Sequence, residues 1–234
     1  MFPRNASKLA IFVCLTLGIA AAATTISDLQ SASGWNGCNT CTNSTGTASS
    51  YSMTQNIASP SLDGKSAHFH LGASAPLADA LWYKRVLSNS GPTHFAFDVQ
   101  FYYKDSSVPT GMEFSANEHV NTRWYRWDWQ CSYYFGVWRI WDNANGKWVN
   151  TSAPCIRPTN YTWTHVTLET HRYNGKVYFD AVTVNGQKHY INISVYPKTL
   201  SYSGNWVTVH YQLNGGRSGA AVDTWADKFS LTYW

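Results

Sequence analysis

Residues 163–186 read WTHVTLETHRYNGKVYFDAVTVNG, and this stretch decides the fold class of the chain. Its first half alternates apolar Val166 and Leu168 with polar neighbours, which is the period of a strand with one buried face. The Asn-Gly pair at 174–175 then favours the positive φ angles of a tight hairpin turn. The second half, 177–184, is apolar on both faces over part of its length. The stretch therefore predicts two antiparallel strands joined by a tight turn.

The same alternation recurs from about residue 66 to the end of the chain. Further strands are expected at 67–71, 94–101, 206–213 and 229–233. Turn residues rich in Asn, Gly and Pro separate these runs. Helical periodicity is nearly absent, and only 77–87 leaves room for a short helical turn. Many strands, hairpin turns and almost no helix predict an all-β protein, an antiparallel sandwich.

The N-terminal residues 1–23 are predicted to form a secretory signal peptide. Arg4 and Lys8 precede an apolar run that begins at Leu9 and ends in four alanines, which offer the small residues of a cleavage site. The run is too short for a comfortable membrane span, and no later stretch is apolar enough for one. We therefore expect an exported soluble protein without membrane insertion, extracellular or periplasmic.

Residues 24–234 are long enough for one sandwich domain, whose first part, 24–65, is rich in Ser, Thr, Asn and Gly and is expected to be loop-rich. Without the leader, 15 basic residues face 13 acidic ones, which gives no argument for a nucleic-acid partner. Aromatic residues make up 16% of the chain, with 12 Trp. Most must fill the core, and we expect at least two Trp to form exposed platforms for sugar rings.

Four cysteines remain after the predicted cleavage, and an even number in an exported chain predicts two disulfides. Cys38 with Cys41 would close a tight loop, and Cys131 with Cys155 would clip a hairpin, stabilising it by ~3 kcal/mol. A redox or metal pair is the alternative for Cys38 and Cys41. Loop-forming residues follow Cys41 where a redox pair would start a helix, and no second pair completes a zinc site. We therefore favour a structural disulfide.

The stretch 163–186 resembles the pattern of tryptophan, strand, hairpin, strand and Asn-Gly found in concanavalin A-like lectins and glucanases. The chain end, DTWADKFSLTYW at 223–234, is similar to the final strand of that fold. The likeness covers roughly residues 60–234. It implies a two-sheet antiparallel jelly roll whose concave sheet carries the ligand, with a polysaccharide or other glycan as the partner.

A second stretch, GMEFSANE at 111–118, resembles the catalytic strand of laminarinase- and lichenase-type glycoside hydrolases, which read Glu-x-Asp-x-x-Glu. The resemblance makes Glu113 the nucleophile and Glu118 the acid/base. Alternation places Glu113, Ser115 and Asn117 on one face, and a β-bulge before Glu118 would turn both glutamates to the groove. Ser115 replaces the expected Asp, so the nucleophile loses a carboxylate neighbour. We therefore favour a groove-lining Glu113 with a solvated Glu118 over a functional pair.

The run 123–129, RWYRWDW, mixes indoles with charged side chains, which a core strand would bury at a cost. At a groove rim the same mixture suits sugars, although Arg over Trp is also an internal brace. Trp138 follows Gly136, which allows close approach of a ligand, and ordinary packing is expected more for Trp141 than for Trp138. The residues expected to contact a glycan are Ser115, Asn117, Trp124, Arg126, Trp127, Trp129, Trp138, His210 and Gln212.

His68 and His70 share one strand face, a spacing also seen in metal sites. The sequence indicates no third ligand, although His165 or His210 could approach in space. A polar sheet face explains both histidines, so we predict no metal site and no cofactor. A structural calcium ion on the convex side stays an open alternative.

Three functions stay open. The favoured one is a secreted, lectin-like carbohydrate-binding protein that recognises a polysaccharide in a concave groove lined with aromatic residues. The first alternative is a retaining endo-β-glucanase-type hydrolase, which needs the Glu113 and Glu118 carboxyls about 5–5.5 Å apart. The second is an extracellular structural or assembly protein. Ser115 favours binding and the second glutamate favours hydrolysis, so the sequence leaves open whether the protein is an enzyme.

Overall fold

The computed structural model describes residues 22–41, 46–47, 50–73 and 75–234. The signal peptide lies outside the described residues except for its last two positions, and it stays a prediction. The regular secondary structure of the described part is strand, apart from one short 3-10 turn, η1 (Leu29–Ser31). No helix in this part is long and apolar enough to cross a membrane. The all-β prediction is confirmed.

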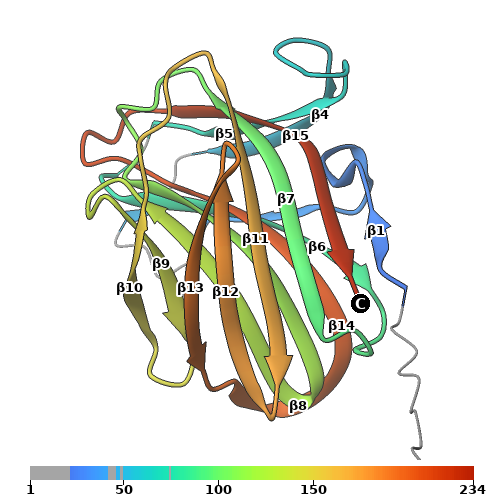
Figure 1. The fold of residues 1–234 in the computed structure, drawn as a ribbon. Coiled ribbons are helices and arrows are strands. Elements are labelled where there is room, and N and C mark those ends of the chain that lie inside the picture. Colours follow the sequence, from blue (N-terminus) through green and yellow to red (C-terminus); the bar gives the residue numbers. More distant parts are fainter. Residues whose placement is uncertain (1–21, 42–45, 48–49, 74) are drawn as a thin grey trace, which may run out of the picture.

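Two sheets stack face to face, and strand pairing is antiparallel except where β3 joins β6 (Figure 1). The eight-stranded sheet has the order β13 (Gln187–Val195), β12 (Lys176–Val184), β11 (Trp163–Tyr173), β7 (His94–Tyr103), β15 (Val222–Tyr233), β5 (Ser66–Leu71) and β4 (Tyr51–Ile57), with β1 (Thr24–Ile26) also paired to β15. The seven-stranded sheet has the order β10 (Lys147–Pro154), β9 (Val137–Asp142), β8 (Gly111–Ser132), β14 (Lys198–Asn214), β6 (Ala78–Leu87) and β2 (Asn36–Cys38), with β3 (Gly46–Thr47) beside β6. This two-layer arrangement is the predicted sandwich.

The stretch that decided the fold class, 163–186, forms the hairpin of β11 and β12. Tyr173 pairs with Lys176 across the turn, and Asn174 takes a positive φ of 47°. Val166 and Leu168 are each 1% exposed, so the apolar parity of β11 faces the core. The predicted hairpin is confirmed.

β8 doubles back on itself and supplies both sides of a second hairpin. Asn121 at its tip has a φ of 52°, a left-handed conformation that asparagine tolerates. The amide of Gln130 donates to Glu113, so the segments 111–121 and 123–132 lie side by side. The first segment pairs with β14 and the second with β9, which places the hairpin in the middle of the sheet.

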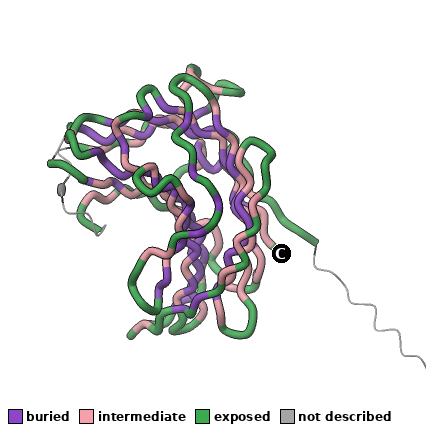
Figure 2. Tube along the Cα trace, turned by 60° about the vertical axis from the view of Figure 1, so that its left-hand side comes forward, coloured by how far each residue is buried: buried purple, intermediate pink, exposed green. Residues whose placement is uncertain are grey.

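The core between the sheets is filled by large aromatic side chains, and buried residues gather where the two layers meet (Figure 2). Trp127 is fully buried, and Trp129 and Trp138 are each 1% exposed. Trp129 stands edge-on to Phe179 of β12, with ring centroids 5.1 Å apart. The prediction that Trp127, Trp129 and Trp138 stack on sugars is therefore wrong, because these indoles join the two sheets.

Residues 77–87, where we left room for a helical turn, hold strand β6 (Ala78–Leu87) instead. Ala78, Ala80 and Trp82 are buried at a spacing of two, which is the period of a strand. Residues 24–65, expected to be loop-rich, hold the short strands β1 to β4 among their connections.

Both predicted disulfides are present. Cys38 and Cys41 are joined within one tight loop, with Cα atoms 5.9 Å apart. Cys131 of β8 is joined to Cys155, with Cα atoms 5.3 Å apart. Because Cys155 directly follows β10, this bond ties the end of β10 to β8.

Candidate functional site

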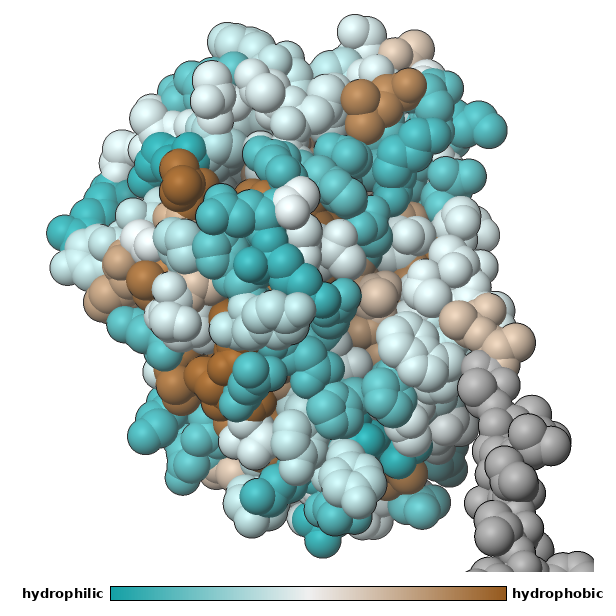
Figure 3. All heavy atoms as spheres, viewed as in Figure 1, coloured by the Kyte–Doolittle hydropathy of each residue, from teal (hydrophilic) through white to brown (hydrophobic). Residues whose placement is uncertain are grey.

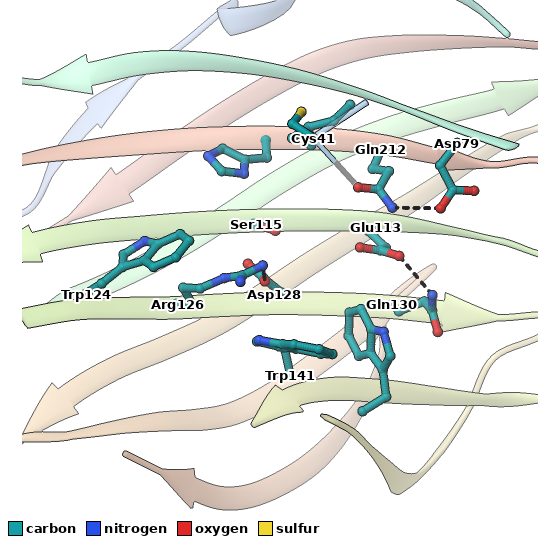
Figure 4. Close-up of a pocket in the computed structure, with 13 residues that line it drawn as sticks. Cys41, Asp79, Glu113, Ser115, Trp124, Arg126, Asp128, Gln130, Trp141 and Gln212 are labelled. Atoms are coloured by element: carbon teal, nitrogen blue, oxygen red, sulfur yellow. Dashed lines mark hydrogen bonds and ion pairs between the residues drawn. The ribbon is translucent and has the colours of Figure 1, made fainter. Parts of the chain in front are cut away.

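A pocket of about 340 Å³ opens on the face of the seven-stranded sheet that points away from the core. This volume lies within the range of about 300–1,000 Å³ that is common for ligand sites. Figure 4 shows that the lining side chains come from neighbouring strands of this sheet. Six predicted site residues line it: Glu113, Ser115, Trp124, Arg126, His210 and Gln212.

Alternation along the second half of β8 explains which residues reach the pocket. Trp124, Arg126 and Asp128 point outward and line it, whereas Tyr125 and Trp127 point into the core. The mixed run is therefore a regular strand and not a loop at a rim. It avoids the cost of charges in the core because its charged parity faces the pocket.

Sequence reasoning did not place seven of the lining residues in the ligand site: Cys41, Asp79, Leu81, Asp128, Gln130, Trp141 and Trp148. Asp128 and Gln130 continue the outward parity of Trp124, which was a usable signal. Trp141 pairs with Trp148 across the hairpin of β9 and β10, and the Asn-Gly turn between them indicates that register. Asp79 has no local signal. The preference for Trp138 over Trp141 was wrong, because Trp138 has the inward parity of β9.

Glu113 lies on the first half of β8, beside Gln130 on the second half (Figure 4). Its Oε1 accepts hydrogen bonds from Gln130 Nε2 at 2.9 Å and from Asn214 Nδ2 at 3.0 Å. Burial raises the pKa of Glu113 to about 8, and the nearby carboxyls of Asp79 and Asp128 also raise it. At neutral pH the group is therefore mainly a protonated acid that can donate a hydrogen bond.

The other two carboxyl groups of the pocket differ in their partners. Burial raises the pKa of Asp79 to about 6, and Gln212 Nε2 lies 3.5 Å from its Oδ2. Asp128 is 2% exposed and forms an ion pair with Arg126 through Oδ2. The pocket thus holds three carboxyl groups and one guanidinium that already has a carboxylate partner.

Several buried polar atoms of the lining have no hydrogen-bond partner among the described residues. They are Trp124 Nε1, Arg126 Nε, Asp128 Oδ1 and Trp141 Nε1. A buried donor or acceptor without a partner costs about 1–3 kcal/mol, so native proteins rarely leave several together. These atoms have almost no exposed surface, so a ligand in the pocket would contact the partly exposed rings and carboxyl groups around them.

The aromatic rings of the pocket form a continuous surface around Arg126. Its guanidinium lies 4.6 Å from the ring centroid of Trp124 and 5.5 Å from that of Trp141. Trp141 meets Trp148 at 67°, with ring centroids 5.3 Å apart. All three indoles are partly exposed, so they meet the expectation of at least two Trp outside the core.

Aromatic side chains continue beyond the pocket along the same sheet face. His119 stacks on Trp124 at 5.5 Å and on Trp206 at 4.4 Å, measured between ring centroids. The Arg85 guanidinium lies 4.4 Å from the centroid of Trp206. We call Trp124, His119, Trp206 and Arg85 the aromatic stripe.

His210 lines the pocket, but both of its ring nitrogens already have partners. Nε2 lies 2.9 Å from Thr208 Oγ1, and Nδ1 accepts from Asn117 Nδ2 at 3.3 Å. Burial lowers the pKa of His210 to about 4, so the ring is neutral at pH 7. Asn117 is fully buried and also accepts from the Trp127 backbone N–H. It is therefore a positioning residue, and the prediction that it contacts a glycan is wrong.

Glu118 lies on the opposite face of β8 from Glu113. The register with β14 runs without a shift from Ser115 through Glu118, so the bulge that a retaining pair would need is absent. Glu118 is fully buried and accepts from Arg172 Nε of β11 at 2.6 Å. Burial raises the pKa of Glu118 to about 7, and Arg172 limits that rise. The retaining pair and the solvated Glu118 are both wrong, because this glutamate belongs to an ion pair between the sheets.

Comparison with known proteins supports the fold. No family model and no curated protein matches the sequence. Among solved structures, the chain is similar to a cellulose induced protein, Cip1, with a TM-score of 0.53 and 9% identity over 85% of this chain and 90% of that one. It is also similar to the endo-β-1,4-glucuronan lyase from the fungus Trichoderma reesei, with a TM-score of 0.52 and 11% identity over 85% and 94%. The chain has the two-sheet jelly-roll fold that the sequence implied.

Proposed function

We propose that the protein binds a polysaccharide through the pocket and the aromatic stripe. The observation that carries this proposal is the pocket in which the partly exposed indoles of Trp124, Trp141 and Trp148 stand beside carboxyl and guanidinium groups. Sugars offer hydroxyl groups to such polar groups and apolar C–H faces to indole rings. Pockets that combine aromatic walls with a few placed polar groups are typical of small-ligand sites.

The charge of the pocket favours a neutral sugar chain over one of uronic acids. Asp79, Glu113 and Asp128 surround the space, and Arg126 is already paired with Asp128. A ligand carboxylate would add a like charge in a partly desolvated site, which is unfavourable. A neutral ligand instead receives a hydrogen bond from protonated Glu113.

Retention on insoluble glucans tests the proposal. We would compare wild type with Trp124→Ala and Trp141→Ala on β-1,3-, mixed-linkage and β-1,4-glucans and on xyloglucan. Tyr173→Ala is the matched control, because this ring is 62% exposed on the eight-stranded sheet. Retention by wild type and the control, with loss in both pocket variants, is the expected result. Equal retention by all four proteins would exclude the pocket as the binding site.

Hydrolysis of the bound chain is a second candidate, favoured by the carboxyl groups around Glu113. A protonated acid beside an ionised carboxylate is the arrangement that glycoside hydrolases use. Glu113 with a pKa of about 8 fits the acid, and Asp128 and Asp79 are its carboxyl neighbours. Release of reducing sugar that disappears in Glu113→Gln would assign hydrolysis to the pocket. Retention without release of reducing sugar would indicate a binding protein. The absence of both retention and release would favour an assembly role.

We also propose that the protein works outside the cell. The two disulfides support this, because such bonds persist in oxidising compartments. N-terminal sequencing of the protein from culture medium should find a start near residue 23. An intact N-terminus, or a protein that stays in the cytoplasm, would contradict export.

A further inference from the structure

A second group of chemically active side chains lies on the outward face of the eight-stranded sheet. His68 and His70 are two residues apart on β5 and share one face. Asp223 of β15 is the cross-strand partner of His70 and brings a carboxylate to the same place. His165 and His210, which sequence reasoning considered as third ligands, do not join them: His165 pairs with Asp98, and His210 lies on the other sheet.

In this cluster two imidazole rings share one carboxylate oxygen. His68 Nε2 and His70 Nδ1 each lie 2.8 Å from the same oxygen, Asp223 Oδ1. The three atoms that can hold an ion lie within 4.8 Å of one another. The side chains are 25%, 32% and 22% exposed in the order His68, His70 and Asp223, so solvent reaches the cluster.

Other histidines of the same sheet provide a comparison. Asp98 bonds His165, and Asp180 bonds His171, each at 2.8 Å and with a single ring. Within the described residues, only Asp223 has two imidazoles and forms a three-membered group of metal-ligating side chains. Two imidazole nitrogens and one carboxylate oxygen in one place are ligand types that transition-metal ions prefer.

The rings around this cluster are held in place. Trp225 stacks on His68 with centroids 4.5 Å apart and an interplanar angle of 20°, and Tyr102 stands edge-on to Trp225. A carboxylate held between two oriented imidazoles is a preformed set of ligands.

We propose that His68, His70 and Asp223 bind a divalent transition-metal ion, with zinc as the best match. Two imidazole nitrogens and one carboxylate oxygen suit zinc, whereas calcium prefers oxygen ligands alone. Water from the open side would complete a tetrahedral site. Zinc ligands lie about 2.0–2.1 Å from the ion, so the present 2.8 Å separations would widen slightly as it enters. Both rings would offer an unprotonated nitrogen, and each proton would move to the other ring nitrogen or to solvent.

Calorimetric titration with zinc chloride tests this site. We would use tag-free protein of residues 24–234, stripped with a chelator, and compare wild type with His70→Gln and His165→Gln. The expected result is one zinc ion per chain for wild type and the His165 control, and a Kd at least about tenfold higher for His70→Gln. No binding by wild type, or the same Kd in all three proteins, would overturn the proposal.

Two further measurements keep the test decisive if His70→Gln fails to fold. Asp223→Asn keeps the size of the side chain and removes its charge, and it should also raise the Kd. Cobalt(II) in the wild-type site should give the strong visible absorption of tetrahedral coordination, and a weak octahedral spectrum would contradict the site. Glucan retention should be unchanged in these variants, because the cluster and the pocket lie on different sheets.

Discussion

Two regions of β8 differ sharply although they belong to one strand. Around Glu113 the outward face offers a protonated acid, partly exposed indoles and buried polar atoms without partners. Around Glu118 the inward face holds a carboxylate with a guanidinium donor from the opposite sheet, packed beside the core. The residue type is the same and the spacing is five, yet one glutamate is available to a ligand and the other joins the sheets.

The difference teaches that residue spacing gives a function only after the face is known. An odd spacing on an uninterrupted strand places two side chains on opposite faces, and only a bulge changes that. The outward face of the eight-stranded sheet differs from the pocket face of the seven-stranded sheet. It is largely hydrophilic (Figure 3), and its carboxylates at Asp98, Asp180 and Asp223 have histidine partners.

The largest expected effect is on the free energy of unfolding, and it distinguishes the inward indoles of β8 from the outward ones. Trp129→Ala should lower the free energy of unfolding by about 3–5 kcal/mol, because it leaves a cavity against Phe179. Trp124→Ala should lower it by less than about 1 kcal/mol and abolish glucan retention. Urea unfolding of both variants checks this, and equal losses of stability would break the comparison of the two faces.

The next effect concerns the ion pair between the sheets. Arg172→Ala should cost about 3 kcal/mol, because it leaves Glu118 buried without its donor. The loss should be greatest above pH 7, where the carboxyl is ionised. Lys188→Ala is the control, since its pair with Glu169 is exposed and should contribute less than about 1 kcal/mol. A similar small loss in both variants would show that Glu118 needs no partner.

Glu113 should make stability fall as pH rises. Its folded pKa of about 8 lies above the ordinary value of 4.5, so the folded state binds more protons between these values. Its contribution is full below about pH 4.5 and is lost towards pH 8, by at most about 1.4 kcal/mol per pH unit. Glu113→Gln should flatten this part of the profile, measured by urea unfolding at pH 5, 6.5 and 8. A decline just as steep in the variant would place the effect elsewhere.

His210 works in the opposite direction, which sharpens the same profile. Its folded pKa of about 4 lies below the ordinary 6.5, so the unfolded state binds more protons between these values. Its contribution is therefore full above pH 6.5 and is lost as pH falls towards 4. His210→Gln should remove that acidic loss of stability. Urea unfolding of the variant and wild type over pH 4–6.5 measures it.

The smallest expected effect concerns the aromatic stripe. Trp206→Ala should weaken binding of long oligosaccharides about fivefold, near 1 kcal/mol, and leave short ones that fill only the pocket unchanged. Titration with an oligosaccharide series of increasing length measures this. A loss that is the same at every length would mean that Trp206 supports the pocket and does not extend it.

The sequence by itself determined the fold class. Alternation at 163–184, the Asn-Gly turns and the cysteine spacing predicted strands, hairpins and both disulfides, because strand period and turn chemistry are local properties. It also sorted residues 112–117 and 124–129 into two parities. The groove residue Glu113 was found in this way.

Only the tertiary structure decided which parity of the second half of β8 faces the core. It also decided which distant strands lie beside each other. Asp79 reaches Glu113, Arg172 reaches Glu118 and Asp223 reaches His70 through sheet order, register or the contact between layers. These contacts arise from pairing and packing of segments far apart in the chain, and no local pattern encodes them. The two glutamates of β8 therefore received their separate roles from the sheets around them.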